Sequence, residues 1–347
     1  MKIYLTKPYD GAEVSLLTEE HKSFLQAGGN GNKSGNQPLD WLNLKRQGQD
    51  HSAPAQIVFA WETQGEEADK CQFKIVFSND SSFKNCREYF CTENNFETSL
   101  FLLGETVYWF VCACCEGQIL CRSEIRKFTV SMQPPRLIFA EGLSNIRDLG
   151  GWQAREGKRI RQGRIFRGCE MEFHHTVTEQ GKYTLCDELQ IKTDLDLRRE
   201  AVGKVFSSAL GPLVNHILLP VNAYGDFLKE EEKKTCRQLF RLFTEEERYP
   251  FYIHCWGGAD RTGTVLFLLG GILGMSEQDL FMDYEFTSFS VWGERSVRSE
   301  LFLSLLEGLH PYGKEGDTIN QKCEAYLLSA GVTEIELNRI REIMLQP

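Results

Sequence analysis

The sequence predicts two domains of different fold class, an all-β sandwich over residues 1–135 and an α/β domain over residues 136–347. The first part contains short runs rich in β-branched and aromatic residues, separated by polar stretches, which is typical of a β-sandwich. In the second part, strand-like runs alternate with helix-like runs, which is typical of an α/β fold. The segment Gln133-Pro134-Pro135 separates the two patterns and marks the expected boundary.

Five apolar runs are the expected strands of the N-terminal domain. They cover residues 56–61, 71–77, 97–101, 106–115 and 126–130. The run 108–111, which reads Tyr-Trp-Phe-Val, resembles the aromatic strand of fibronectin type III-like modules. We therefore expect a sandwich of this kind, and a protein partner is a candidate ligand for it.

In the C-terminal part, helix caps and strand patterns alternate. Thr178 and Ser276 are each predicted to cap a helix, because a hydroxyl side chain can accept from the free N–H groups of the first turn. Thr333 and Glu336 form a capping box at the start of a terminal helix. Residues 192–197 read as a strand. We expect a central, mainly parallel sheet flanked by helices.

Residues 254–263 are the most informative stretch of the chain and read His-Cys-Trp-Gly-Gly-Ala-Asp-Arg-Thr-Gly. An apolar, strand-like run precedes this stretch, and a helix-like run from 264 to 273 follows it. A glycine-bearing loop between a strand and a helix N-terminus is suited to bind an oxyanion, because free backbone N–H groups and the helix dipole both favour negative charge there.

The residue types in this loop fit both the binding of a phosphate and an attack on it. Gly257 and Gly258 are free to adopt positive φ, so the loop can turn successive N–H groups inward. Arg261 supplies a planar fork for two phosphate oxygens. The same positive field stabilises a nucleophilic thiolate at Cys255, and Thr262 is placed to donate its hydroxyl to that sulfur.

A purely structural interpretation competes with this one. Cysteine is often a small buried hydrophobe, so an isolated Cys-x5-Arg spacing favours a free buried thiol and a surface ion pair. Here His254, Gly258, Thr262 and Gly263 stand in register around that spacing, between a strand and a helix. This combination favours the functional interpretation.

The pattern His-Cys-x-x-Gly-x-x-Arg-Thr-Gly resembles the signature of the cysteine-dependent protein tyrosine phosphatase superfamily. Three further segments, 145–151 (Asn-Ile-Arg-Asp-Leu-Gly-Gly), 163–167 and 196–200, look like landmarks of a bacterial branch that includes phosphoinositide-hydrolysing members. The resemblance covers about residues 136–347. It implies that Cys255 is the nucleophile and Arg261 the phosphate clamp. It also implies a substrate-binding loop made of His254, Trp256, Gly257, Gly258, Ala259 and Gly263.

The general acid that protonates the leaving oxygen has two candidates. The resemblance places an Asp on a loop after a strand ending in Leu-Pro, and here Pro220 is followed by Asp226. The alternative for Asp226 is an ordinary helix N-terminal residue. Asp260, inside the loop, is the rival, because a carboxyl beside a dianion can stay protonated through charge repulsion.

Composition limits the partners. A net charge of −10 argues against nucleic acid or an anionic membrane as a bulk partner. We expect no membrane insertion and no signal peptide, since no run of 18 apolar residues and no apolar N-terminal core is present. The twelve cysteines are too sparse for a disulfide scaffold, and the group 112–115 lies in an expected strand rather than in a zinc pattern. These features predict a cytoplasmic protein without metal or cofactor.

The expected function is hydrolysis of phosphate monoesters, with phosphotyrosine favoured, on a phosphorylated protein or a small ester. A phosphatase for phosphoinositides or inositol phosphates is the nearest alternative, although this branch often has a lysine at the position of Ala259. A catalytically silent module that binds phosphorylated ligands is an alternative of another class. Sulfur transfer by a persulfide-carrying loop is a third, but the run Arg261-Thr262-Gly263 favours phosphate.

Overall fold

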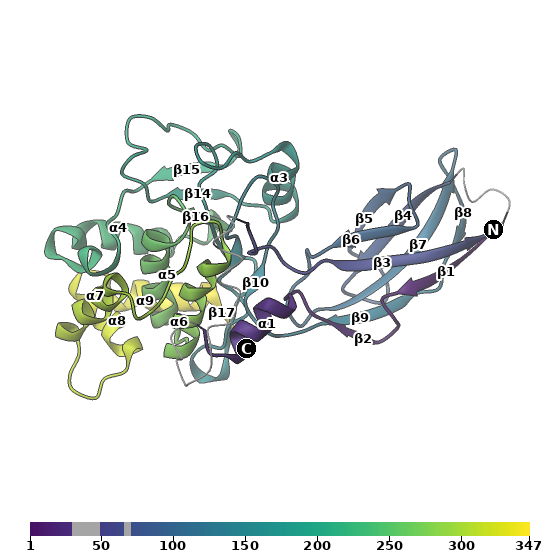
Figure 1. Ribbon diagram of the computed structural model, residues 1–347. Coiled ribbons are helices and arrows are strands. Elements are labelled where there is room, and N and C mark those ends of the chain that lie inside the picture. The colour runs from purple at the N-terminus through teal and green to yellow at the C-terminus, as the bar shows by residue number, and fades with distance from the viewer. Residues whose placement is uncertain (30–48, 66–70) are drawn as a thin grey trace. The chain divides into compact units, whose positions relative to one another are not determined.

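The computed structural model describes residues 1–29, 49–65 and 71–347. The chain separates into two compact units (Figure 1), which are described one at a time. Unit 1 contains Met1–Thr18 and Pro54–Pro134, and unit 2 contains Glu19–Ala53 and Pro135–Pro347. Glu19–Ala53, which the sequence analysis assigned to the N-terminal domain, therefore belongs to the unit that carries the candidate site.

Two β-sheets form unit 1. One has the strand order β1-β3-β6, and the other has the order β2-β9-β7-β4-β5 with β8 paired to β7. All pairs are antiparallel except β2 with β9. The strands are β1 (Lys2–Lys7), β2 (Ala12–Val14), β3 (Ile57–Gln64), β4 (Gln72–Ser78), β5 (Cys86–Cys91), β6 (Asn95–Thr98), β7 (Thr106–Cys115), β8 (Gln118–Arg122) and β9 (Arg126–Val130).

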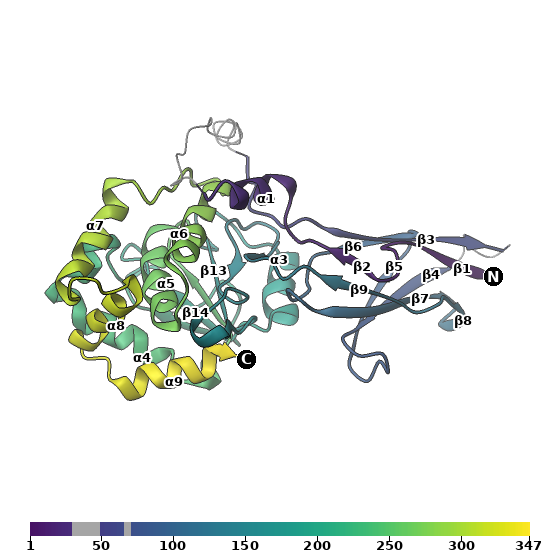
Figure 2. The same cartoon turned by 90° about the horizontal axis from the view of Figure 1, so that it is seen from below.

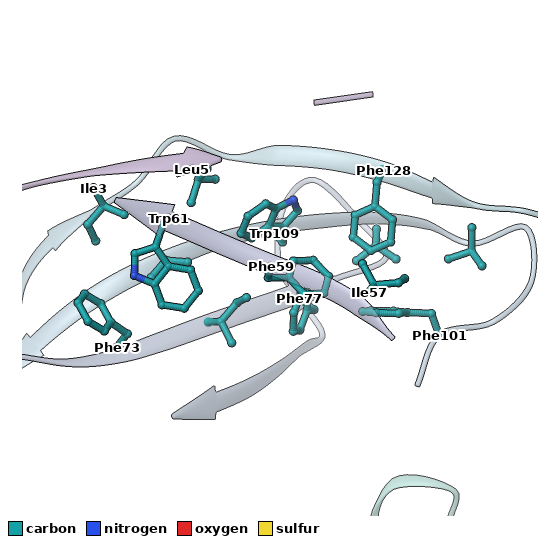
Figure 3. Close-up of a cluster of buried hydrophobic side chains, with 14 of the residues drawn as sticks. Ile3, Leu5, Ile57, Phe59, Trp61, Phe73, Phe77, Phe101, Trp109 and Phe128 are labelled. Atoms are coloured by element: carbon teal, nitrogen blue, oxygen red, sulfur yellow. The ribbon is translucent and has the colours of Figure 1, made fainter. Parts of the chain in front are cut away.

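The two sheets of unit 1 share one aromatic core (Figure 3). Side chains alternate between the faces of a strand, so Ile57, Phe59 and Trp61 of β3 are all buried on the same face. The Phe59 ring lies 4.8 Å from the ring of Phe77 on β4 and 5.0 Å from Trp109 on β7, centroid to centroid. The Tyr-Trp-Phe-Val run therefore contributes its tryptophan to the centre of this core.

Unit 2 is built on a six-stranded sheet with the order β10-β11-β13-β16-β14-β15. Its four strands from β13 to β15 in that order are parallel, while β10 and β11 pair antiparallel. The strands are β10 (Arg136–Leu137), β11 (Arg147–Asp148), β13 (Ile165–Gly168), β14 (Thr193–Asp196), β15 (Asn215–Leu218) and β16 (Phe251–His254); β12 (Arg159–Ile160) pairs with β17 (Leu345–Gln346).

Helices lie on both sides of these strands, with α3 on the opposite side from α5 in both views (Figures 1 and 2). The helices are α1 (Glu19–Gln26), α3 (Glu179–Tyr183), α4 (Lys233–Leu242), α5 (Asp260–Leu273), α6 (Glu277–Glu285), α7 (Glu300–Leu309), α8 (Ile319–Ser329) and α9 (Glu334–Met344). Shorter turns are η2 (Arg155–Gly157), η3 (Thr184–Glu188), η4 (Tyr224–Leu228), η5 (Glu230–Glu232), η6 (Glu246–Arg248), η7 (Phe286–Phe289) and η8 (His310–Tyr312). The mixed α/β prediction is confirmed.

The local helix signals also hold. Thr178 caps α3, Ser276 caps α6, and Thr333 with Glu336 forms the capping box of α9. Helix α5 is buried from Thr262 to Leu273, as expected for a helix that is apolar on every side. No helix among the described residues has both the length and the apolar character needed to cross a membrane.

Helix α1 packs within unit 2 although it precedes most of unit 1 in the chain. His21 and Phe24 are both fully buried. Their rings contact Phe286 and Phe289 of η7, at centroid distances between 4.6 and 5.5 Å. Figure 2 shows α1 beside the end of α6, where η7 begins.

Candidate active site

The oxyanion loop, defined here as residues 255–259, joins β16 to α5. His254, the last residue of β16, is level with Gly168 on β13 and with Asp196 on β14. The loop therefore starts at the carboxyl ends of parallel strands and leads into the N-terminus of a helix, where backbone N–H groups have no intrahelical partner. Cys255 is buried at the start of the loop.

The two glycines of the loop are needed for different reasons. Gly258 has a φ of 62°, and a Cβ on it would lie 2.1 Å from the carbonyl oxygen of Gly168. Gly257 is needed for space, since a Cβ there would lie 2.6 Å from the indole ring of Trp292. Gly258 is therefore required for its positive φ, whereas Gly257 is required because the Trp292 ring packs directly against its backbone.

The carbonyl groups of the loop are held from behind by buried side chains. Asn145 donates from Nδ2 to the oxygen of Gly257 at 2.7 Å, and Arg167 donates from Nη2 to the oxygen of Gly258 at 2.6 Å. Because a peptide unit is planar, a carbonyl held on one side directs the N–H of the same unit to the other side. These two contacts therefore favour the inward orientation of N–H groups that oxyanion binding needs.

A buried cluster of charges lies beneath the loop. Asp283 of α6 accepts from Arg147 Nε at 3.0 Å and from Arg167 Nη1 at 2.6 Å, and all three side chains are at least nine-tenths buried. Burial alone raises the pKa of Asp283, but the two arginines hold it below its usual value. Burial and the neighbouring Arg167 lower the pKa of Arg147 to about 10. Two cations against one carboxylate leave net positive charge under the loop.

Arg261 is held by a carboxylate that the sequence analysis named only within a landmark segment. Its Nη1 and Nη2 donate to the two oxygens of Glu200, each at 2.8 Å. The hydrogen bond from Arg261 lowers the pKa of Glu200 to about 2. Glu200 ends the Asp-Leu-Arg-Arg-Glu segment, which begins at the last residue of β14. The sequence analysis gave Glu200 no role; its place shortly after a strand adjacent to β16 is the signal that could have identified it.

His254 and Thr262 lie on either side of the loop. His254 Nε2 lies 2.9 Å from Asp194 Oδ1; burial opposes its charge, but the carboxylate raises the pKa of His254 to about 9. Thr262 is fully buried, and its Oγ1 has no hydrogen-bond partner among the residues that the structure describes. Ala259 is the N-cap residue of α5, and Gly263 faces Tyr284. The donation from Thr262 to the Cys255 sulfur stays a prediction.

A model of the tyrosine phosphatase family matches residues 138–346, which include the whole loop and the buried arginines. The chain belongs to this family. It is 26% identical over 167 residues to a "Putative tyrosine-protein phosphatase" from Cupriavidus necator. That match covers 41% of this chain and 59% of the relative, so the chain spans less than two thirds of that protein.

Among solved structures, the chain is similar to the core catalytic domain of the PP-IP phosphatase SIW14 from S. cerevisiae, in complex with citrate. The sequence identity is 15% and the TM-score is 0.32. The match covers 56% of this chain and 96% of that one.

In this member of the tyrosine phosphatase family, the Asp260 carboxylate accepts hydrogen bonds from two side chains, Arg295 and Tyr224. Arg295 donates to it from Nε at 2.8 Å and from Nη2 at 3.1 Å, one bond to each carboxylate oxygen. The Tyr224 hydroxyl donates to Oδ1 as well, and it lies 2.7 Å from the Tyr284 hydroxyl. Burial and the adjacent Asp260 raise the pKa of Tyr224 far above its usual value. Sequence reasoning missed Arg295 and Tyr224.

Asp226 has a different environment. It lies in η4, two residues after Tyr224, and its side chain is 64% exposed. Its Oδ1 lies 2.6 Å from Lys229 Nζ. The structure therefore brings Tyr224 of this segment onto the first turn of α5, directly after the oxyanion loop, whereas the Asp226 carboxylate forms a solvent-exposed ion pair.

An aromatic rim flanks the loop in this family member. We use this name for Phe173, His174, Trp256 and Trp292. The His174 ring lies 4.8 Å from Trp256 and 5.5 Å from Trp292, and Phe173 lies 5.7 Å from Trp256. The buried Glu170 carboxylate accepts backbone N–H groups from residues 172–175 and so fixes this turn. Of the rim, the sequence analysis had identified Trp256 alone.

Proposed function

We propose that the protein hydrolyses phosphate monoesters, phosphotyrosine in particular, through a cysteinyl-phosphate on Cys255. The observation that carries the proposal is the pair of contacts behind the loop, from Asn145 and Arg167 to the carbonyls of Gly257 and Gly258. They favour a loop whose N–H groups face the position of a phosphate bound at Cys255. Electrostatic stabilisation by such fixed donors supplies the largest single contribution to many reactions of this type.

The reaction has two steps. The Cys255 thiolate attacks phosphorus, so that an S–P bond forms while the ester P–O bond breaks, and the leaving oxygen takes a proton from an acid. Water then attacks the cysteinyl-phosphate, which releases inorganic phosphate and restores the thiolate. Arg261 uses two of its five N–H donors on Glu200. The remaining N–H donors are available for phosphate oxygens, in an orientation that Glu200 fixes.

We assign the proton donor to Asp226. Both oxygens of Asp260 accept from Arg295, and a carboxylate engaged at both oxygens by a cation is poorly suited to carry the proton that a leaving group needs. Asp226 lies in η4 and pairs with the exposed Lys229. A surface pair of this type is easily exchanged. Tyr224, the first residue of η4, contacts Asp260, which follows the loop directly. Asp260 then has the role of fixing Tyr224 and Arg295.

The aromatic rim supports an aryl ester as the substrate. Aromatic side chains bind a flat ring through stacked or edge-to-face contacts, and the rim lies directly beside the oxyanion loop. Ala259 adds no positive charge at the position where a lysine would favour a substrate with several phosphates. Among the three proposed substrate classes, phosphotyrosine fits these features best.

Unit 1 is proposed to be a fibronectin type III-like β-sandwich that binds a protein partner. Its two sheets bury one common core, and none of the residues assigned to the reaction lies in it. We further propose that the protein works in the cytoplasm. Its twelve cysteines are all free thiols, and the nucleophilic thiolate needs reducing conditions.

Initial rates on four substrates test the proposal, namely a phosphotyrosine peptide, a phosphoserine peptide, a phosphoinositide and inositol hexakisphosphate, each with Cys255→Ser as the blank. We expect the highest kcat/KM on the phosphotyrosine peptide. A higher kcat/KM on either inositol compound would show that the substrate is an inositol phosphate or phosphoinositide instead of phosphotyrosine. The cysteinyl-phosphate mechanism would still stand. Binding of tungstate without turnover of any substrate would establish a silent binding module instead.

A further inference from the structure

Residues 51 and 52 are held against η7 within unit 2, which carries the candidate site and is called the catalytic unit below. His51 donates its backbone N–H to the carbonyl of Phe289 at 2.8 Å. The His51 carbonyl oxygen lies 2.8 Å from Nε2 of the buried His21 on α1. Helix α1 and residues 51 and 52 are thereby held together on η7, so the residue that follows His51 has a defined position.

That residue is Ser52, which is 6% exposed. Its Oγ donates to Asp50 Oδ1 at 2.7 Å, and Asp50 Oδ1 also accepts from the Ser52 backbone N–H at 2.9 Å. Since the hydroxyl proton is used on Asp50, the lone pairs of Ser52 Oγ are available as acceptors. They accept the backbone N–H of Asn145 at 2.8 Å, across 93 residues of sequence.

Asn145 connects this contact to the oxyanion loop. It is 1% exposed and has a φ of 63°, the left-handed region that residues other than glycine rarely occupy. Its Oδ1 accepts from Arg147 Nη1, which fixes the amide so that Nδ2 points to the carbonyl of Gly257. Backbone and side chain of Asn145 are therefore each fixed by a partner, Ser52 on one side and Arg147 on the other.

We propose that Ser52 is a positioning residue for the oxyanion loop. It holds the Asn145 backbone, and Asn145 holds the Gly257 carbonyl, so Ser52 sets how well the loop N–H groups face a bound oxyanion. Helix α1 and residues 51 and 52 then contribute to the catalytic unit, although they precede most of unit 1 in the chain. The catalytic consequence rests on the proposed function, while the effect on oxyanion binding does not.

The test compares Ser52→Ala with Ser144→Ala in the full chain. Ser144 is the matched control, because it precedes Asn145, is 3% exposed, and its Oγ has no hydrogen-bond partner among the described residues. We measure the Kd of tungstate by calorimetry, kcat and KM on an aryl phosphate, and the thermal unfolding midpoint. Ser52→Thr keeps the hydroxyl and is the rescue variant.

Ser52→Ala is expected to weaken tungstate binding and to lower kcat/KM by about tenfold each, the scale of one buried hydrogen bond. Ser144→Ala should leave both within about twofold, and Ser52→Thr should recover most of the loss. Equal tungstate affinity in the two alanine variants would overturn the proposal. A lower unfolding midpoint in Ser52→Ala with unchanged tungstate affinity would overturn it too, because that result describes a structural role alone.

The readouts also separate this inference from the proposed function. If the wild-type protein binds tungstate but hydrolyses no phosphate ester, the proposed function fails and the role of Ser52 is still decided by the affinities of the variants. If Ser52→Ala leaves tungstate affinity unchanged while Cys255→Ser abolishes turnover, the role of Ser52 fails and the proposed function stands.

Discussion

The two sides of the oxyanion loop are held by very different interactions. Behind the loop, Arg147, Arg167 and Asp283 form an ion cluster that is almost fully buried. In front of it, Arg261 pairs with Glu200 through side chains that are 20% and 43% exposed. Buried pairs fix one geometry because breaking them leaves an uncompensated charge, whereas exposed pairs exchange easily with water. The back therefore sets the shape of the loop, and the front is free to engage a substrate.

The largest effect is expected for the nucleophile, which lies between the two sides. Cys255→Ser should reduce turnover of an aryl phosphate by roughly 10⁴-fold or more, because a serine hydroxyl is not ionised near neutral pH. Tungstate binding and the free energy of unfolding should stay close to those of the wild type, since both sides of the loop are intact. Residual turnover above about 1% of the wild-type rate would contradict a covalent mechanism at this residue.

The next largest effect is expected behind the loop. Asp283→Asn leaves two buried arginines without their carboxylate and should lower the free energy of unfolding by about 3–5 kcal/mol. Denaturant unfolding of the full chain measures this. Glu277→Gln is the matched control, since it removes an exposed carboxylate from the same helix α6 and should change stability by less than about 1 kcal/mol. Equal stability of the two variants would mean that the back of the loop is not fixed by charge.

In front of the loop, Arg261→Lys should affect the rate more than stability. Lysine keeps the charge but loses the planar fork, so kcat should fall by on the order of a hundredfold, about 3 kcal/mol. The free energy of unfolding should change by less than about 1 kcal/mol, because the pair with Glu200 is partly exposed. A kcat within about threefold of the wild type would exclude the clamp role.

The two candidate aspartates should differ in leaving-group dependence. Asp226→Asn should slow alkyl phosphates by at least about tenfold while barely changing activated aryl phosphates, since only alkoxide leaving groups require the proton. It should also remove the high-pH limb of the rate profile. Asp260→Asn should weaken tungstate binding without this dependence on the leaving group. The reverse pattern would assign the proton to Asp260, despite its contacts with Arg295.

The smallest effect is expected for Glu200→Gln. Glutamine keeps one acceptor for Arg261, so kcat/KM should fall by only about threefold to tenfold. The pKa of Glu200 is lowered to about 2, so its folded-state charge is lost only as the pH falls through that value. Wild type and variant should therefore show parallel rate profiles from about pH 5 to pH 8. Profiles that diverge within this range would show that Glu200 takes part in proton transfer.

The loop itself was predictable because its information is local. The spacing of Cys255 and Arg261, the glycine at 258 and the caps of α3, α6 and α9 all depend on residues close in sequence. The partners of the loop were not predictable in this way. Glu200 is 61 residues from Arg261, and Ser52 is 93 residues from Asn145, so only the tertiary fold brings them together.

The extent of the catalytic unit was misjudged for a related reason. The compact units divide between Pro134 and Pro135, one residue before the expected boundary, and Glu19–Ala53 lies in unit 2. Helix α1 has only eight residues, which is too short for a clear periodic signal, and its burial depends on η7 near the other end of the chain. A protein cut at Arg136 would lack both α1 and Ser52. The activity of such a fragment would therefore reflect the loss of α1 and Ser52 as well as the loss of unit 1.

The position of α1 also has a consequence for the order of synthesis. Helix α1 is synthesised before most strands of unit 1 and long before Phe286 and Phe289, on whose rings His21 and Phe24 pack. Domains begin to fold while the chain is still growing. The sheets of unit 1 can therefore assemble before η7, the surface on which α1 packs, has been synthesised. A chain that ends prematurely exposes Phe24, an apolar signal that a nascent-chain chaperone or protease can recognise.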